Sequence, residues 1–202
     1  MSKRIIYTVW VVWEFLFRLF GRVRPLKRNE RHLFYIAKRR YLGKPFDVDG
    51  VHVDRFDLVV ELHMNNYLLM DVLREQTSLV GLAVKLVQEA KKSLPVLAES
   101  LRNQKFNQAQ VLYGITFIHR GVERFGFQIL PLRRHFIRSV TTWHLKHIFR
   151  IVNPNAEAML SKHPDVFEPM IVAMSKEHLF SNYGPGQSPT SSTMSRRDHV
   201  LT

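Results

Sequence analysis

The sequence predicts a single α+β domain, with one mixed sheet of about four to six strands, several packing helices and an N-terminal amphipathic helix. Short β-rich runs alternate with longer segments of helical spacing. An Asp49-Gly50 dipeptide between two short apolar runs marks a tight hairpin. Of the 202 residues 46% are hydrophobic, enough for one core. The absence of cysteine excludes disulfides, thiolate metal sites and cysteine nucleophiles.

The first segment, residues 5–20, is expected to form a helix with ten apolar residues on one half of its surface. Its 16 residues rise about 24 Å, less than the ~30 Å hydrocarbon core of a bilayer, and Glu14 and Arg18 interrupt the run. A simple transmembrane span is therefore not predicted. No small-residue cleavage site follows, so a signal peptide is not predicted either. The apolar face, with its two tryptophans, fits either a membrane interface or the core of the domain itself.

The net charge of +13 is concentrated in two blocks, residues 1–44 and 120–150. A positive block attracts phospholipid headgroups, acidic glycans or nucleic acid. No nucleic-acid-binding motif accompanies the charge, so an anionic membrane surface or an acidic glycan is the favoured partner. We expect the protein to lie in the cytoplasm or peripherally on the inner face of the membrane. The residues expected to contact an anionic surface are Trp10, Trp13, Arg18, Arg22, Arg24, Lys27 and Arg28.

The next elements begin with a short basic helix, predicted over residues 30–41 from its apolar spacing. A hairpin over 46–53 follows, and residues 57–63 then read as a strand buried on both faces.

The remainder of the domain is predicted as helices and strands in alternation. Asn65 or Asn66 is a candidate N-cap for the first helix, Pro95 should kink or divide the second, and Gly114 indicates a close backbone approach or a bulge. Residues 1–183 are assigned to the domain, and the polar residues 184–202 to a disordered tail. The expected helices are 67–76, a long one from Ser78, 135–151 and 176–183, and the expected strands are 111–118, 127–130 and 169–174.

Polar side chains cluster near the ends of three predicted strands. If those strands were parallel neighbours, the side chains would meet at one edge of the sheet, where ligands usually bind. Proton-transfer candidates are His63, His119 and Glu61. Candidates for ligand binding are Asn65, Asn66, Arg120 and Ser175.

Metal and cofactor sites are not predicted. His144 and His147 are spaced as neighbours on a helix, but no carboxylate accompanies them on that face. No glycine-rich loop that could cradle a phosphate is present, and Ser175 does not lie in a nucleophile elbow. The sequence therefore predicts neither a metal nor a cofactor.

Two strings of residues carry a family resemblance. Glu61-Leu-His63-x-Asn65-Asn66 and Tyr113-Gly-Ile-Thr-x-x-His119-Arg120-Gly121, in this order, resemble the YkoP-like domain of Gram-positive bacteria. In some proteins that domain is appended to a polysaccharide deacetylase, so the resemblance implies a bacterial protein with a cell-envelope context. The family's activity is unknown, and this chain contains no deacetylase domain.

Three functions remain open at this point. The first is a basic binding or accessory protein acting at the membrane surface or on an anionic envelope lipid or glycan. The second is an enzyme with a site around His63 and His119. The third, supported by charge alone, is a nucleic-acid binder.

Overall fold

The computed structural model describes residues 23–75, 79–116, 119–132 and 168–185, apart from residue 28, and isolated positions between 139 and 161. The predicted helix at 5–20, most of the predicted helix at 135–151 and the tail from 186 onward lie outside the described residues.

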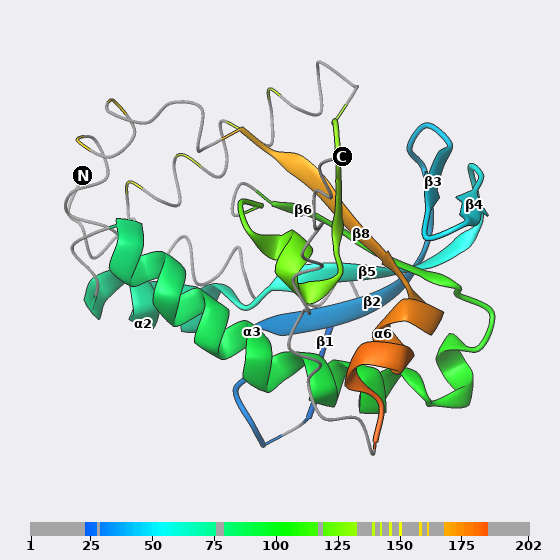
Figure 1. Ribbon diagram of the computed structural model, residues 1–202, viewed down its shortest axis with the longest axis horizontal. Coiled ribbons are helices and arrows are strands. Elements are labelled where there is room, and N and C mark those ends of the chain that lie inside the picture. The colour runs from blue at the N-terminus through cyan, green and yellow to red at the C-terminus, as the bar shows by residue number, and fades with distance from the viewer. Residues whose placement is uncertain are drawn as a thin grey trace, which may run out of the picture.

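A six-stranded mixed sheet forms the centre of the fold, as predicted (Figure 1). Its strand order is β1-β2-β5-β6-β8-β7. The inner strands β5 and β6 run parallel, and every other neighbouring pair in this sheet is antiparallel. The strands are β1 (Arg24–Pro25), β2 (Phe34–Arg40), β5 (Leu58–Met64), β6 (Val111–Thr116), β7 (Gln128–Leu130) and β8 (Met170–Ser175).

Strand β2 corrects the helix predicted for residues 30–41. It pairs with β5 along its whole length, from Phe34 opposite Met64 to Arg40 opposite Leu58. Ile36 packs into the core on one face, whereas Tyr35 and Ala37 are buried on the other. Because both faces are buried, apolar residues occupy consecutive positions, and their spacing also resembles that of a helix. Aromatic and β-branched residues favour the strand.

A separate hairpin, β3 (Phe46–Val48) and β4 (Val51–Val53), confirms the turn predicted at Asp49-Gly50. Both turn residues have positive φ angles, 50° and 77°, as a two-residue hairpin turn requires. Asp49 also ties the hairpin to the sheet. One carboxylate oxygen accepts from the backbone N–H of Ser175 at 2.7 Å, and the other from Gln128 Nε2 at 2.9 Å.

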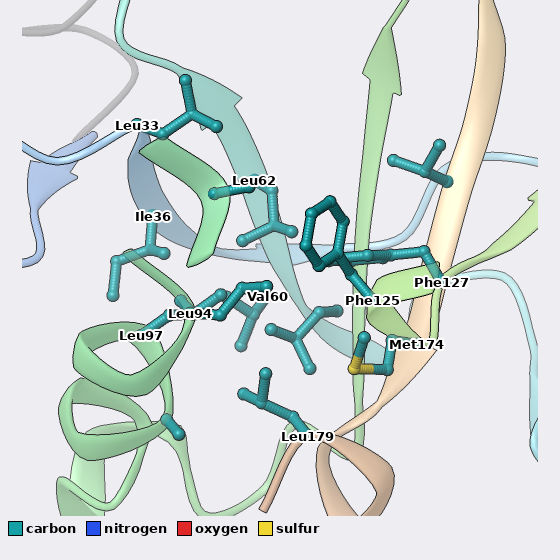
Figure 2. Packing of buried hydrophobic residues seen from close by; sticks show 14 of the residues in the cluster. Leu33, Ile36, Val60, Leu62, Leu94, Leu97, Phe125, Phe127, Met174 and Leu179 are labelled. Carbon is teal, nitrogen blue, oxygen red and sulfur yellow. The ribbon is translucent and has the colours of Figure 1, made fainter. Parts of the chain in front are cut away.

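Helix α3 (Leu79–Leu101) lies along one face of the sheet, and α6 (Lys176–Tyr183) packs near its C-terminal end (Figure 1). Leu94, Leu97 and Leu101 are fully buried in the main core. Figure 2 shows Leu94 and Leu97 facing side chains of the sheet such as Val60. Pro95 does not divide the helix. It is exposed, so water can replace the backbone hydrogen bond that proline cannot donate.

The opposite face of the sheet carries two smaller apolar clusters. One joins the hairpin to the sheet through residues such as Tyr41, Val48 and Val111, and the other contains Val23, Tyr35 and Ala37. The face that carries α3 therefore holds the main core.

Candidate functional site

A cavity of about 810 Å³ lies between the N-terminal half of α3 and the sheet, where β5 and β6 end. The connection from β5 to β6 runs through α2 (Asn66–Glu75) and α3, so the two parallel strands end on the same edge. Ligands commonly bind at this edge of parallel strands. The apolar walls include Leu33, Leu62, Leu86, Phe125, Phe127 and Val172.

The pattern of side chains along α3 accounts for the cavity's position. One row, which includes Leu82, Leu86 and Ala90, is buried against the sheet. A second apolar row with helical spacing, Val80, Ala83, Val84 and Val87, lines the cavity. Helix α3 therefore has a second apolar side in this half; Val87 also packs against the main core, whereas Val80, Ala83 and Val84 are exposed.

Gly114 of β6 also belongs to the cavity wall. A Cβ atom at this position would lie 2.9 Å from the backbone oxygen of Leu62 on β5. The close backbone approach predicted for Gly114 is therefore confirmed. Only glycine allows the two strands to approach without a clash here.

Three exposed cations, Lys91, Arg120 and Arg124, stand among the lining residues, and we call them the cationic rim. Arg120 precedes the short 3₁₀ helix η2 (Val122–Phe125), which begins after Gly121 with φ 79°, and Arg124 lies within it. Arg124 Nε donates to the carbonyl of Gly121 at 2.9 Å, which holds the guanidinium over the turn. Among the described residues that line the cavity, none is a carboxylate. The cavity therefore favours an anion.

His63 is among the lining residues, but its register with Tyr35 puts its side chain on the sheet face opposite α3, where it joins a polar network with Glu61. Its Nε2 atom lies 3.3 Å from Glu61 Oε2, which also accepts from Arg39 Nε at 3.3 Å. Burial alone would raise the pKa of Glu61, but the hydrogen bond and positive charge of His63, together with Arg39, lower it below its usual value. Glu61 is therefore held as a carboxylate beside an imidazole.

Tyr113 on β6 lies opposite Glu61 in the parallel register. Burial raises the pKa of its hydroxyl, and the negative charge of Glu61 and a hydrogen bond to it raise that pKa further. Tyr113 is therefore a neutral hydrogen-bonding group in this network. The pair of neighbouring strands thus brings Glu61, His63 and Tyr113 together.

His119 and Arg120 follow the end of β6. Burial lowers the pKa of His119, and the charge of Arg120 lowers it further, against an opposing hydrogen bond to the carbonyl of Glu168. His119 Nε2 is buried without a hydrogen-bond partner in the described part of the chain. The imidazole is thus favoured in its neutral form. Arg120 is exposed at the cavity.

Asn65 is a structural cap. Its side chain is buried, Oδ1 accepts from the N–H groups of Tyr67 and Leu68 at 3.2 and 3.3 Å, and Nδ2 donates to the carbonyl of His32 at 3.0 Å. Both ends of its amide are therefore engaged, in keeping with the N-cap alternative. Asn66 is the first residue of α2 and is half-buried.

Ser175 does not join the other candidates. Strand β8 is antiparallel to β6, so Ser175 pairs with Val111 at the opposite edge of the sheet. There its Oγ accepts from the N–H of His178 at 3.1 Å and caps α6. The expectation that three strand ends converge is correct for β5 and β6 and wrong for β8.

The basic residues predicted to contact an anionic surface fall mostly outside the described residues. Arg24 is exposed in β1, and Lys27 lies 3.8 Å from Glu30 and 3.6 Å from Glu99. In the described part of the chain, no three His, Asp or Glu side chains are grouped to hold a metal ion. Among the described helices, none has both the length and the hydropathy needed to cross a bilayer.

Lys91 and Arg124 were not among the predicted site residues. For Lys91, the sequence pattern that points to the cavity is its helical spacing with Val80, Val84 and Val87, which indicates a second apolar row that ends in a cation. No comparable pattern identifies Arg124. These residues of α3 line a cavity because the helix lies at a distance from the sheet in this region. The local sequence does not encode that distance.

Comparison with known proteins gives one family. The family model described as the YkoP domain matches residues 3–183. The chain is also 26% identical over 138 residues to a protein of Bacillus subtilis (strain 168) named Uncharacterized protein YkoP, covering 67% of this chain and 75% of that protein. No solved structure matches.

Proposed function

The chain belongs to the YkoP family, and from that premise we propose that it binds an anionic lipid at the membrane surface. The observation that carries the proposal is the composition of the cavity. Its walls are apolar, and its described charged residues are cations without a carboxylate. A hydrocarbon chain gains roughly 0.8 kcal/mol for each CH₂ group that it buries, and a negative headgroup is attracted to the cationic rim.

A lipid fits these walls better than a glycan does. Sugars present hydroxyl groups on most of their surface, and each buried hydroxyl that lacks a partner costs free energy. The cavity is lined mainly by aliphatic and aromatic side chains. In this proposal the apolar residues of the 5–20 segment, with Trp10 and Trp13, contribute the membrane contact that the sequence predicts.

The test is a titration of the purified chain with cis-parinaric acid, a fluorescent fatty acid. We expect the acid to bind, its uncharged methyl ester to bind more weakly, and polygalacturonate, an acidic glycan without a hydrocarbon chain, to compete poorly. Failure of the acid to bind, or full displacement by polygalacturonate, would overturn the proposal.

Arg120→Glu should weaken binding of the acid by about tenfold, or ~1.4 kcal/mol, because it reverses a charge of the cationic rim. Arg55→Glu is the matched control. Arg55 is also exposed, but it contacts the Phe56 ring and does not line the cavity. If the two variants bind the acid equally well, the rim does not recognise the headgroup.

The Glu61–His63 pair favours acid–base catalysis as a second candidate function. A carboxylate beside an imidazole can orient it for proton transfer, and the pair lies next to the cavity at the end of β5, on the sheet face opposite α3. The titration tests this candidate too, because hydrolysis of the methyl ester would release the acid and methanol. Ester cleavage that His63→Ala abolishes would support an enzyme, and an unchanged ester mass after incubation argues against hydrolysis.

A further inference from the structure

The N-terminal half of α3 exposes large apolar side chains to solvent. Val80 is 74% exposed and Val84 52% exposed, and Ala83 between them is also exposed. The three residues are spaced as neighbours on one side of the helix. Single exposed apolar residues are common on protein surfaces, but neighbouring ones beside a cavity form a patch that indicates an interaction site.

This patch is continuous with the cavity. Val80, Ala83 and Val84 all line it, so the exposed side of the helix and the apolar interior form one surface. A hydrocarbon chain that leaves a bilayer at this point would remain in contact with apolar side chains throughout its transfer. A partner protein would have no comparable need for a connected cavity.

The charges nearby are mainly positive. Lys91, Arg120 and Arg124 line the same cavity. Of the nearby carboxylates, Glu89 is buried and lies 2.9 Å from Lys92 Nζ. Glu123 is exposed in η2 and is the opposing charge on this side. The three cations of the rim outnumber it, which suits an anionic lipid surface.

We propose that Val80, Ala83, Val84 and the cationic rim, together the docking surface, rest on an anionic phospholipid bilayer, with the cavity open toward the lipid. The inference rests on the proposed function, because it assigns the route by which that ligand enters. The valines enter the interfacial region of the bilayer, while the cations contact phosphate groups.

Site-specific labelling tests the docking surface directly. The chain contains no cysteine, so Val80→Cys and Leu42→Cys can each be labelled at a single position with the environment-sensitive dye NBD. Leu42 is a suitable control because it is 57% exposed and does not line the cavity. On phosphatidylglycerol vesicles we expect the emission at position 80 to increase and shift to shorter wavelength, with little change at position 42. Equal responses at the two positions would overturn the docking surface.

Charge substitutions provide the second measurement. In co-sedimentation with phosphatidylglycerol vesicles, Val80→Asp/Val84→Asp should lose about tenfold in partitioning relative to Leu42→Asp/Phe56→Asp. The control adds the same two charges at similarly exposed positions, since Phe56 is 51% exposed. Equal partitioning of the two double variants refutes the inference. A wild-type dimer that only Val80→Asp/Val84→Asp dissociates would instead assign this surface to a second copy of the chain.

The outcome separates this inference from the proposed function. If the wild-type chain binds cis-parinaric acid but neither measurement distinguishes the docking surface from its control, the docking surface is wrong and the cavity's ligand class stands. If the acid does not bind, the proposed function fails whatever the vesicles show.

Discussion

The two ends of strand β6 have different surroundings. At its beginning, the polar groups near Val111 are used inside the protein: the N–H of Ser175 donates to Asp49, and Lys176 Nζ donates to the carbonyl of Phe106 at 2.9 Å. At its other end, beyond Thr116, the side chains surround a cavity and its exposed cations.

Helix α3 spans both ends and shows the same contrast. Its C-terminal half buries Leu94, Leu97 and Leu101 completely, whereas its N-terminal half exposes Val80 and Val84. Apolar area that is removed from water stabilises the fold, and apolar area that is left in water does not. The C-terminal half of α3, the beginning of β6 and the hairpin, together called the closed end, therefore hold the domain together. The N-terminal half of α3 and the end of β6, called the open end, leave apolar area in water beside the cavity.

The largest expected effect is on stability at the closed end. Leu97→Ala should lower the free energy of unfolding by about 3 kcal/mol, because it removes buried methyl groups and leaves a cavity in the core. Val84→Ala removes methyl groups that are half in water already, and should change stability by less than ~0.5 kcal/mol. Urea unfolding followed by circular dichroism measures both. Similar losses for the two variants would remove the contrast between the halves of α3.

A smaller loss of stability is expected when Asp49 can no longer hydrogen-bond the hairpin to Ser175 and Gln128. Asp49→Ala removes the acceptor of two hydrogen bonds, one from buried backbone, and places alanine at a positive φ; the expected loss is about 2 kcal/mol. Asp49→Asn should retain most of the stability, because asparagine tolerates this φ and keeps one acceptor oxygen. Thermal unfolding of the two variants measures the difference. If Asn is as destabilising as Ala, the carboxylate charge rather than the acceptor geometry holds the hairpin.

The closed end could be read largely from the sequence. The Asp49-Gly50 turn is predictable from local backbone preferences, and helix 176–183 is found at the predicted bounds as α6 (Lys176–Tyr183). The helix predicted at strand β2 is wrong, because a strand buried on both faces loses the alternation that identifies strands.

The open end could be read only in part. The expectation that β5 and β6 are parallel neighbours is confirmed, and His63 and Arg120 are both among the residues that line the cavity near their ends. The prediction that Ser175 lies with His63 and Arg120 is wrong, because β8 is antiparallel to β6. Tertiary pairing decides the direction of a strand, and the local sequence does not specify it. The cavity volume depends on the separation of α3 from the sheet, and no short-range pattern specifies it.

The smallest expected effect is a pH dependence at the open end. Burial, followed by the charge of Arg120, lowers the pKa of His119 below 6.5 in the folded protein. The unfolded chain therefore binds the proton more readily, and the contribution of His119 to stability is present above pH 6.5 and declines as the pH falls below it. His119→Gln cannot titrate, so the variant should lose less stability than the wild type between pH 7 and 5.

The closed end supplies the control for this measurement. His52 on the hairpin has a raised pKa, caused first by its hydrogen bond to Asp47, so it contributes with the opposite sign: its stabilisation is present at low pH and declines as the pH rises through its folded pKa. His52→Gln should therefore reduce the loss of stability as the pH rises above 6.5, whereas His119→Gln should reduce the loss as the pH falls below 6.5. Urea unfolding at several pH values gives both slopes. Because the two pKa values are shifted in opposite directions from 6.5, the contribution of His119 changes below this pH and that of His52 above it, and the pair of variants separates the two. If His119→Gln leaves the slope below pH 6.5 unchanged, burial at the open end does not disfavour the protonated form of His119.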